Sequence, residues 1–316
     1  MNECFENGEI QYLTITEEDV GVRIDKVLIN HYKDIQSRTY FQYLIQNHHI
    51  LVNNNPVKKQ FKAKIGDIVE IHFVLTPELN LEPESIPLNI VYEDGYILVV
   101  NKSAGMVVHP APGNWSGTFV NALLYHCNLT KEQFATESHR PGIVHRLDKE
   151  TSGLLIAAKD TKTQQRLIEL FAAREISKEY IAICCGNPGD GEIEAPIGRH
   201  PYERKLMCIR KEGGRHSVSH YQTLASDGKI SIVKIQLITG RTHQIRVHMK
   251  HIGYPVLGDA TYGNVQLNKR YHTKRQLLHA YSLELLHPIT SEKLTLKAPF
   301  PEDIKKIFDI LQFNGL

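Results

Sequence analysis

The stretch RPGIVHRLDKETSGLLIAAKD, residues 140–160, contains two apolar runs separated by a charged segment. The runs, residues 143–144 and 154–158, favour buried strands. Three polar side chains lie between them: His145, Arg146 and Asp148. A cation and a carboxylate are therefore expected side by side at the edge of a buried sheet. Such a segment is also typical of an ordinary turn, and the motifs further along the chain decide between the two interpretations.

A second informative stretch is LITGRTHQIRVHMKHIGYPVLGDATYG, residues 237–263. Its alternation predicts a strand with Thr242, Gln244, Arg246 and His248 on one face and Arg241, His243, Ile245 and Val247 on the other. The three histidines at 243, 248 and 251 have no Cys or carboxylate near them before Asp259, and the neighbouring cations would repel a metal ion. We therefore expect no metal here and favour contacts to a nucleic-acid backbone and base edges.

The composition is that of a globular protein with two domains. The chain has 316 residues, of which 41% are hydrophobic and 23% charged, which excludes a disordered chain. Its apolar runs are too short for a membrane helix, and the acidic start MNECFENGEI differs from a signal peptide. The five cysteines are odd in number and form no C-x-x-C pair, so we expect neither a disulfide framework nor a zinc site, and a cytoplasmic location.

The net charge of +2 hides an uneven distribution. Residues 20–66 carry eight Lys and Arg against two Asp, a net of +6, whereas residues 76–97 carry five acidic residues and no basic ones. Further basic clusters occur at residues 199–215 and 269–275. A single cluster is usually a solvated face, but several of them together favour an RNA partner despite the small total.

The pattern of elements divides the chain into an N-terminal tail (1–10), a small helix–hairpin domain (11–75), an acidic Pro-containing linker (76–88) and a larger domain (89–316). In the small domain we expect one helix from Ile24, a second capped by Ser37, a strand at residues 50–53, a turn at residues 54–56 and a strand at residues 66–73.

In the larger domain we expect a hairpin around Asp94, and a helix at residues 161–174 that Asp160 caps and that faces inward through Leu167, Leu170 and Phe171. A C-terminal amphipathic helix, PEDIKKIFDILQF, should close the core without a catalytic part.

The small domain resembles the S4 RNA-binding domain through RIDKVL, SRTYFQYLI, ILVNNNPV and KAKIGDIVEI. The sequence departs from that pattern at Asn47-His48-His49, where such domains usually have a glycine before the strand. The resemblance implies that the helices and the loop lie against an RNA helix and contact its shape and phosphates. The basic residues implied in binding are Arg23, Lys26, Arg38, Lys58, Lys59 and Lys62.

The larger domain closely resembles the RluA-type RNA pseudouridine synthase family. The motifs occur in the family's order: YEDGYILVVNKSAGMVVHP, RPGIVHRLDKETSGLLIAAK, SKEYIAI, PIGRHPYERKLM, LITGRTHQIRVHMKHIGYPVLGDATYG and RQLLHAYSLELLHP. Together with the small domain they are most similar to the branch acting on large-subunit ribosomal RNA. The resemblance implies an α+β fold with a mixed, largely antiparallel sheet and flanking helices, and an isomerase that needs no cofactor or metal.

The resemblance also implies residue roles. Asp148 of HRLD matches the family's catalytic Asp, Arg246 of HQIR its paired arginine and Tyr180 of KEY the tyrosine that stacks on the target base. Arg146 matches an arginine that enters the space left by the flipped base. We also assign RNA contacts to His145, Arg241 and His243.

Three alternatives stay open. The substrate could be transfer RNA or another ribosomal site, because several branches of the family share every motif quoted. The chain could be a non-catalytic RNA-binding assembly factor, or a hydrolase that releases free uracil. Nothing in the sequence demands a protein partner or more than a monomer.

Overall fold

The structure is a computed structural model of the chain and describes residues 9–32, 38–74, 81–110, 114, 116–130, 134, 140–203 and 206–315. Some sequence predictions concern residues outside these ranges: Cys4, Lys33, Ser37 as a helix cap, Arg204 and Lys205; the side chain of Arg38 is not described either. None of the described helices has both the length and the apolar composition needed to cross a membrane.

The chain divides into two compact units, Met1–Leu81 and Glu82–Leu316. The first contains β1 (Ile10–Thr14), the 3-10 helix η1 (Glu17–Asp19), α1 (Ile24–His31), α2 (Arg38–Gln46), β2 (Ile50–Val52), β3 (Asn55–Pro56) and β4 (Ile68–His72). Its strands pair antiparallel in the order β1-β4-β2-β3. Apolar side chains of α1, α2 and the sheet form one core around Phe41 and Phe73. Strand β1 starts at a residue that the sequence analysis assigned to the tail.

Left-handed backbone shapes two turns of this unit. The β2–β3 turn consists of Asn53 and Asn54, with φ angles of 49° and 62°, so the expected turn at residues 54–56 is wrong by one position. A two-residue hairpin turn with both φ angles positive matches the twist of its strands, and Asn tolerates that geometry. His48, between α2 and β2, has a φ of 61°. It occupies the place where the resemblance predicts glycine.

The second unit contains nine paired strands, a two-stranded hairpin and five helices among its described residues. The strands are β5 (Ile90–Glu93), β6 (Ile97–Lys102), β7 (Ser152–Ala158), β8 (Ser177–Cys185), β9 (Gly191–Glu194), β10 (Ile197–Arg199), β11 (Met207–Ile209), β12 (Val218–Ser226), β13 (Ile230–Leu237), β14 (Leu278–Leu286) and β15 (Lys293–Lys297). The helices are α3 (Phe119–His126), α4 (Thr161–Ala173), α5 (Gln244–His251), α6 (Val265–Arg270) and α7 (Glu302–Ile310).

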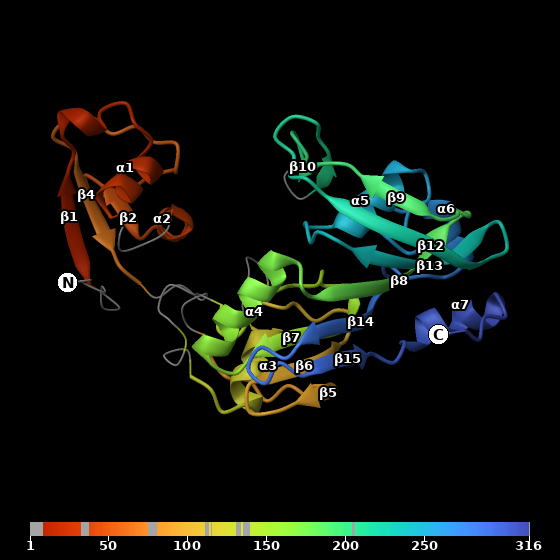
Figure 1. The fold of residues 1–316 in the computed structure, drawn as a ribbon. Helices are drawn as coiled ribbons and strands as arrows, with labels where there is room; N and C mark the ends of the chain where they lie inside the picture. The colour runs from red at the N-terminus through yellow and green to blue at the C-terminus, as the bar shows by residue number, and fades with distance from the viewer. Residues whose placement is uncertain are drawn as a thin grey trace. The chain divides into compact units, whose positions relative to one another are not determined.

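One mixed sheet organises this unit. Its order is β5-β6-β7-β14-β8-β13-β12-β9, with β15 added beside β14. Strands β7 and β14 pair in parallel, and the other neighbours pair antiparallel. Figure 1 shows α3 and α4 with β6 and β7, and α5 and α6 with β9, β12 and β13. The expected α+β class with a largely antiparallel mixed sheet is confirmed.

Local sequence signals place several of these elements as expected. Asp160 caps α4 by accepting from the backbone N–H of Thr163, and Leu167 on that helix is fully buried. Asp94 turns the chain between β5 and β6 by accepting from two backbone N–H groups. Helix α7 buries Ile304 and Ile307 against the sheet. The segment 82–88 is extended coil whose residue Glu84 accepts from the backbone of Gly117, so this part of the expected linker belongs to the second unit.

The strand expected at residues 241–248 is wrong. Strand β13 ends at Leu237, and residues 244–251 form helix α5. Ile245 and Met249, four positions apart, both enter the core, which is helical rather than strand spacing. Residues 244–249 are all buried, whereas Thr242 is exposed and Arg241 and His243 are half-buried, so the two faces of the alternation do not separate core from solvent.

Candidate active site

A carboxylate and a guanidinium meet at the centre of the second unit. Asp148 lies in the loop that leads into β7, and Arg246 lies in the first turn of α5. Arg246 Nη1 donates to Asp148 Oδ2 at 2.9 Å, and the Asp148 side chain is 18% exposed. The two residues are 98 positions apart in the sequence. The pair expected from the two motifs is therefore formed, and its carboxylate stays accessible.

A second carboxylate fixes the guanidinium. Asp259 receives Arg246 Nε at 2.6 Å and Nη2 at 3.0 Å, a two-pronged contact. It also accepts from the backbone N–H groups of Thr261 and Tyr262. Burial alone would raise the pKa of Asp259, but these donors outweigh it and lower the pKa. Arg246 consequently keeps its Nη1 group free to donate to Asp148, and the contact with Asp259 limits its movement.

Tyr180 lies on β8 next to this pair. Its side chain is almost completely buried and lines the same cleft as Asp148 and Arg246. Burial, and then the negative charge of Asp148, raises the pKa of its hydroxyl, so the ring stays a neutral phenol at physiological pH. A flat aromatic ring beside a carboxylate offers a surface on which a base can stack.

His243 adds a neutral imidazole to the cleft. It caps α5 in a left-handed conformation with a φ of 56°, and its Nε2 lies 3.9 Å from Asp148 Oδ2. Its Nδ1 is 2.9 Å from Tyr262 Oη, which in turn accepts from the backbone N–H of Met207. Burial and the neighbouring arginines lower the pKa of His243 although Asp148 acts to raise it. The ring is thus held in place from the side facing away from the cleft.

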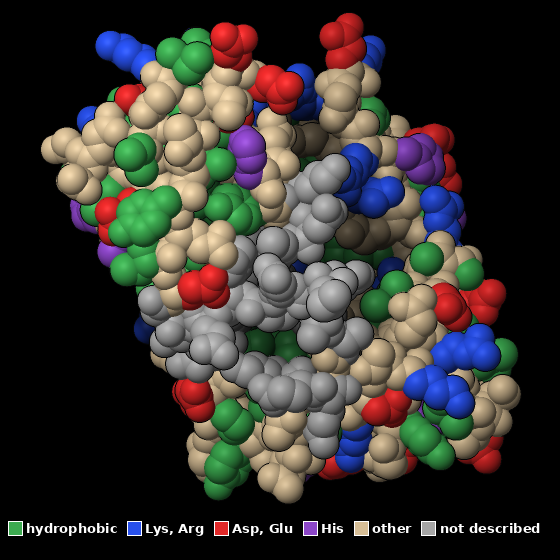
Figure 2. Space-filling model, turned by 90° about the vertical axis from the view of Figure 1, so that its left-hand side faces the viewer, with side chains coloured by type: hydrophobic (Ala, Val, Ile, Leu, Met, Phe, Trp, Pro, Cys, Tyr) green, Lys and Arg blue, Asp and Glu red, His purple; other side chains and the backbone are tan. Residues whose placement is uncertain are grey.

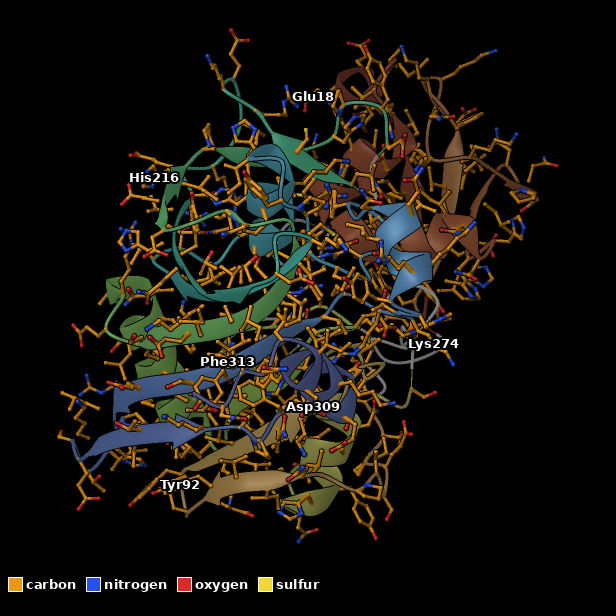
Figure 3. All side chains as sticks on the ribbon, turned by 90° about the vertical axis from the view of Figure 1, so that its right-hand side faces the viewer. Glu18, Tyr92, His216, Lys274, Asp309 and Phe313 are labelled. Atoms are coloured by element: carbon orange, nitrogen blue, oxygen red, sulfur yellow. The ribbon has the colours of Figure 1, made fainter. Side chains whose placement is uncertain are left out.

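These residues line an open cleft with a volume of about 100 Å³. Its walls are Arg146, Leu147, Asp148, Thr151, Tyr180, Leu237, Gly240, Arg241, Thr242, His243, Gln244, Ile245, Arg246 and Leu278. Arg146 is exposed, and Arg241 Nε donates to the carbonyl of His216, which is labelled in Figure 3. The structure therefore brings six predicted residues to one place: Asp148, Tyr180, Arg246, Arg146, Arg241 and His243. Two arginines lie at the rim of the cleft, and the Asp148 carboxyl group lies inside it.

His145, for which the sequence predicts an RNA contact, does not line the cleft. Its Nε2 accepts from the backbone N–H of Ile156 at 3.0 Å, and its ring stacks on Phe171 with a centroid distance of 4.9 Å. Burial, with a smaller effect of Lys178, lowers the pKa of His145 to about 3. The side chain fixes the loop against β7 and α4 from the inside.

The predicted RNA-binding residues of the first unit have different surroundings. Lys26, Lys58, Lys59 and Lys62 are exposed. Arg23 caps α1 and makes a two-pronged contact with the fully buried carboxylate of Asp25 at 2.9 and 3.1 Å. Its guanidinium is therefore partly committed to the fold. Arg38 begins α2.

Asp259, Tyr262 and Lys102 were not assigned to the site from the sequence. Asp259 and Tyr262 are in the quoted GDATYG motif, and a lone acidic residue beside basic and aromatic neighbours was the available signal. Lys102 is 2% exposed and donates to three backbone carbonyls near Asp148. No pattern in the sequence indicates that this lysine is buried.

Among the described residues, Glu93, His126 and Cys127 bring potential metal ligands within 4.8 Å of one another. Lys159 donates to one oxygen of Glu93 at 2.6 Å and His126 lies 2.9 Å from the other, so the carboxylate already has partners. Burial raises the pKa of the Cys127 thiol, which disfavours the thiolate that a metal needs. We assign no metal to this cluster.

Comparison with known proteins connects this geometry to one chemistry. The family model described as RNA pseudouridylate synthase matches residues 96–251. An uncharacterized RNA pseudouridine synthase of Bacillus subtilis (strain 168) is 41% identical over 305 residues, covering 96% of this chain and 98% of its own. The ribosomal large subunit pseudouridine synthase D of Zymomonas mobilis is 39% identical over 316 residues, covering 96% of this chain and 98% of its own.

Solved structures agree with this result. Human RNA pseudouridylate synthase domain containing 1 superposes with a TM-score of 0.55 at 30% identity, covering 70% of this chain and 86% of its own. Human RNA pseudouridylate synthase domain containing 4 superposes with a TM-score of 0.55 at 26% identity, covering 72% of this chain and 94% of its own.

Proposed function

The chain belongs to the RNA pseudouridine synthase family, and on this premise we propose that it isomerises uridines in large-subunit ribosomal RNA with Asp148 as the catalytic residue. The reaction breaks the bond from ribose C1′ to uracil N1, turns the detached base and joins C1′ to C5. Substrate and product are isomers, so no oxidant or transferred group is needed.

The Asp148–Arg246–Asp259 arrangement carries the proposal. The chemistry needs a group that stabilises or captures positive character at C1′, later accepts the proton from C5, and stays ionised beneath a stacked base. One carboxylate meets all three needs, as carboxylates do in glycoside cleavage. Asp148 is accessible in the cleft, and the Arg246 guanidinium at 2.9 Å favours its charged form when the base excludes water.

Two further side chains have assigned roles. Tyr180 stacks on the target base, which its position in the cleft wall and its neutral phenol allow. Flipping that base out of its helix costs a few kcal/mol. Arg146, exposed at the cleft, offsets part of this cost by stacking its planar guanidinium on the bases left behind.

The substrate assignment rests on relatives and on charge. Relatives named ribosomal large subunit pseudouridine synthase D, from Zymomonas mobilis, Xanthomonas campestris and Neisseria meningitidis, are 35–40% identical along almost the whole chain. The exposed lysines of the first unit, Lys26, Lys58, Lys59 and Lys62, would contact phosphates of a structured RNA in the way the S4-like sequence implies. We place the protein in the cytoplasm, where ribosomal RNA is modified.

Tritium release tests the assignment. The wild-type chain and Asp148→Asn are incubated with large-subunit ribosomal RNA and transfer RNA transcripts that carry tritium at uridine C5. We expect wild type to release tritium from the ribosomal transcript, and Asp148→Asn to release none while binding RNA as tightly, because no other carboxylate replaces Asp148 in the cleft lining. Glu150→Gln, which removes one carboxylate from the same turn, is the matched control and should stay active.

Each other result has a distinct meaning. Tritium release by Asp148→Asn would contradict the catalytic assignment. Release from transfer RNA alone would replace the substrate. Free uracil in the products would identify a hydrolase, and RNA binding by wild type without any release would indicate an assembly factor.

A further inference from the structure

The backbone carbonyls of the turn that follows Asp148 are bound by other groups of the protein. The turn closes when the backbone N–H of Thr151 donates to the carbonyl of Asp148 at 3.0 Å. The carbonyls of Lys149 and Glu150, which point away from the turn, are each bound by a buried cation. A surface turn would normally leave such carbonyls to water, so this arrangement needs an explanation.

Lys102 is the first cation. It is the last residue of β6, is 2% exposed, and its Nζ donates to the carbonyls of Ser103 at 2.8 Å, Met106 at 3.0 Å and Lys149 at 3.1 Å. The backbone N–H of Gly105 donates to the same Lys149 carbonyl at 2.9 Å. Three acceptors match the three N–H bonds of an ammonium group. Lys102 therefore ties the loop after β6 to the turn after Asp148.

Arg275 is the second cation. Its Nη1 donates to the carbonyl of Glu150 at 3.0 Å, and the adjacent Gln276 donates from Nε2 to Thr151 Oγ1 at 3.2 Å. The other face of the guanidinium binds Asp303 of α7 through Nε at 2.7 Å and Nη2 at 2.8 Å. Helix α7 is thus connected to the catalytic turn by one carboxylate and one arginine.

The sheet explains why these groups meet. Strand β6 runs antiparallel to β7, with Lys102 opposite Gly153, so the end of β6 lies at the start of β7. Strand β14 runs parallel to β7, with His279 opposite Ser152, so the residues just before both strands also lie together. Gly153 permits this approach, because a Cβ there would lie 2.2 Å from the carbonyl oxygen of Ala280. Three strand ends therefore enclose the turn.

We propose that Lys102, Arg275 and Asp303 are positioning residues for catalysis: they clamp the turn of residues 148–151 and so hold the Asp148 carboxylate against Arg246 at the reacting carbon. This inference rests on the catalytic role proposed for Asp148. Arg246 lies on α5 and is anchored by Asp259, a residue of the loop that follows this helix. The position of Asp148, in contrast, depends on its own turn. A displacement of about 1 Å between reacting groups can cost roughly a hundredfold in rate. The clamp therefore holds Asp148, the member of the pair that Asp259 does not contact.

The burial of Lys102 supports this assignment. Burial lowers the pKa of its ammonium group to about 7, with Arg275 contributing and Glu150 and Asp148 opposing. A buried cation of this kind is costly to keep unless its contacts are needed. The sequence predicts only that helix α7 closes the core. Through Asp303 this helix also holds Arg275, which binds the turn after Asp148.

Asp303→Asn tests the clamp in the full-length chain. The amide keeps the size of the side chain but replaces one acceptor oxygen by an NH₂ group that faces the guanidinium, which weakens the hold on Arg275. Because the Asp303 side chain is 42% exposed, the variant should fold. On saturating C5-tritiated large-subunit ribosomal RNA we expect kcat to fall about 10-fold, with KM and RNA affinity within about twofold of wild type.

Two further variants separate positioning from stability. Asp309→Asn removes the same charge from the same helix. Asp309, labelled in Figure 3, is exposed and makes no side-chain hydrogen bond within the described part of the chain. It should keep wild-type kcat. Asp303→Glu restores a carboxylate and should recover most of the lost kcat. A purely structural role would lower only the fraction of folded enzyme, measured by thermal unfolding, and kcat per folded active site would stay at the wild-type value.

The outcomes are distinct. Wild-type kcat in folded Asp303→Asn overturns the clamp, as does an equal loss in Asp309→Asn or no recovery in Asp303→Glu. If Asp303→Asn does not fold, Asp303→Ser, which also removes the carboxylate, takes its place with the same fall in kcat at wild-type KM expected, and wild-type kcat in that variant would overturn the clamp. Activity in Asp148→Asn would instead remove the catalytic role proposed for Asp148, whatever the result at Asp303.

Discussion

At the scale of single residues, the motif HRLD places neighbouring side chains in different environments. His145 turns inward, where its ring accepts a backbone hydrogen bond and stacks on Phe171. Arg146 is exposed at the cleft, and Asp148 lies inside it beside Arg246. A residue's membership in a catalytic motif therefore does not establish a contact with substrate. His145 serves the site by fixing the loop that carries Asp148.

The burial of His145 gives a pH dependence of stability. Its pKa is lowered from 6.5 to about 3 in the folded chain, so the unfolded chain takes up a proton at pH values where the folded chain does not. Stability should consequently fall as the pH is lowered through 6.5 towards 3. Between pH 6.5 and 5 this one group should cost about 1.5 kcal/mol.

The measurement is urea unfolding at pH 6.5 and pH 5 for wild type and His145→Gln. The variant should be less stable at pH 6.5 because the stacking on Phe171 is lost, and it should lose less stability than wild type on acidification. The same loss on acidification in both proteins would show that His145 takes up its proton equally well when folded.

At the scale of elements, the backbone conformation of a few positions sets the joints between helices and strands. His243 caps the start of α5, and His48 lies in the turn after α2. Both have positive φ angles, which are uncommon for residues other than glycine. His243 is held there by Tyr262 and lines the cleft. His48 is exposed, and no described side-chain contact compensates its strain.

Replacing His48 by glycine should stabilise the first unit. The left-handed conformation costs a residue with a Cβ about 1–2 kcal/mol, and the greater freedom of glycine in the unfolded chain returns roughly 0.4–1 kcal/mol of that. We expect a net gain of about 0.5–1 kcal/mol, measured by hydrogen exchange at the Ile71 amide in the core of the unit.

Asn47→Gly is the matched control. Asn47 has no positive φ and donates from Nδ2 to the carbonyl of Tyr43, so glycine there should lower stability. Equal effects of the two glycine substitutions would argue against backbone strain at His48.

At the scale of the whole molecule, local charge rather than total charge governs the expected affinity for RNA. The net charge is only +2, yet residues 20–66 carry +6. On the face drawn in Figure 2, Lys and Arg side chains occur in groups interspersed with Asp and Glu, so they do not add up to one uniform field. RNA binding should therefore depend on particular groups of lysines and fall steeply with salt.

Charge reversal in the first unit tests this expectation. Lys58, Lys59 and Lys62, all exposed, are changed to Glu together. RNA affinity should fall. The slope of log affinity against log salt concentration should become shallower by the equivalent of up to about three phosphate contacts. Both quantities are measured by filter binding between 50 and 200 mM salt. The rate of isomerisation on saturating RNA should change little, because the cleft lies within the second unit.

The control applies the same charge change elsewhere. Lys293, Lys305 and Lys306 are exposed residues of the second unit, away from the cleft lining, and their change to Glu should leave the salt dependence close to wild type. Equal losses in both triple variants would mean that total charge, not its location, controls binding.

The sequence alone predicted the fold class, the family and the pairing of Asp148 with Arg246, and the structure brings these two side chains together. Patterns such as the cap at Asp160, the turn at Asp94 and the inward face of α7 act over a few residues, so they can be read locally. The motifs containing Asp148 and Arg246 were recognised because their residues are contiguous, although the residues themselves are 98 positions apart.

Other features became visible only in the tertiary structure, because they depend on which side chains are buried and on which distant segments of the chain lie side by side. The run at residues 241–248 alternates like a strand, but residues 244–251 form helix α5, from which Ile245 and Met249, one turn apart, both enter the core. His145 faces the interior, and Asp259 anchors Arg246. The turn after Asp148 lies between Lys102 and Arg275 because β7 pairs antiparallel with β6 and parallel with β14. Strand pairing joins residues far apart in the chain, and no local pattern encodes which strand ends will meet.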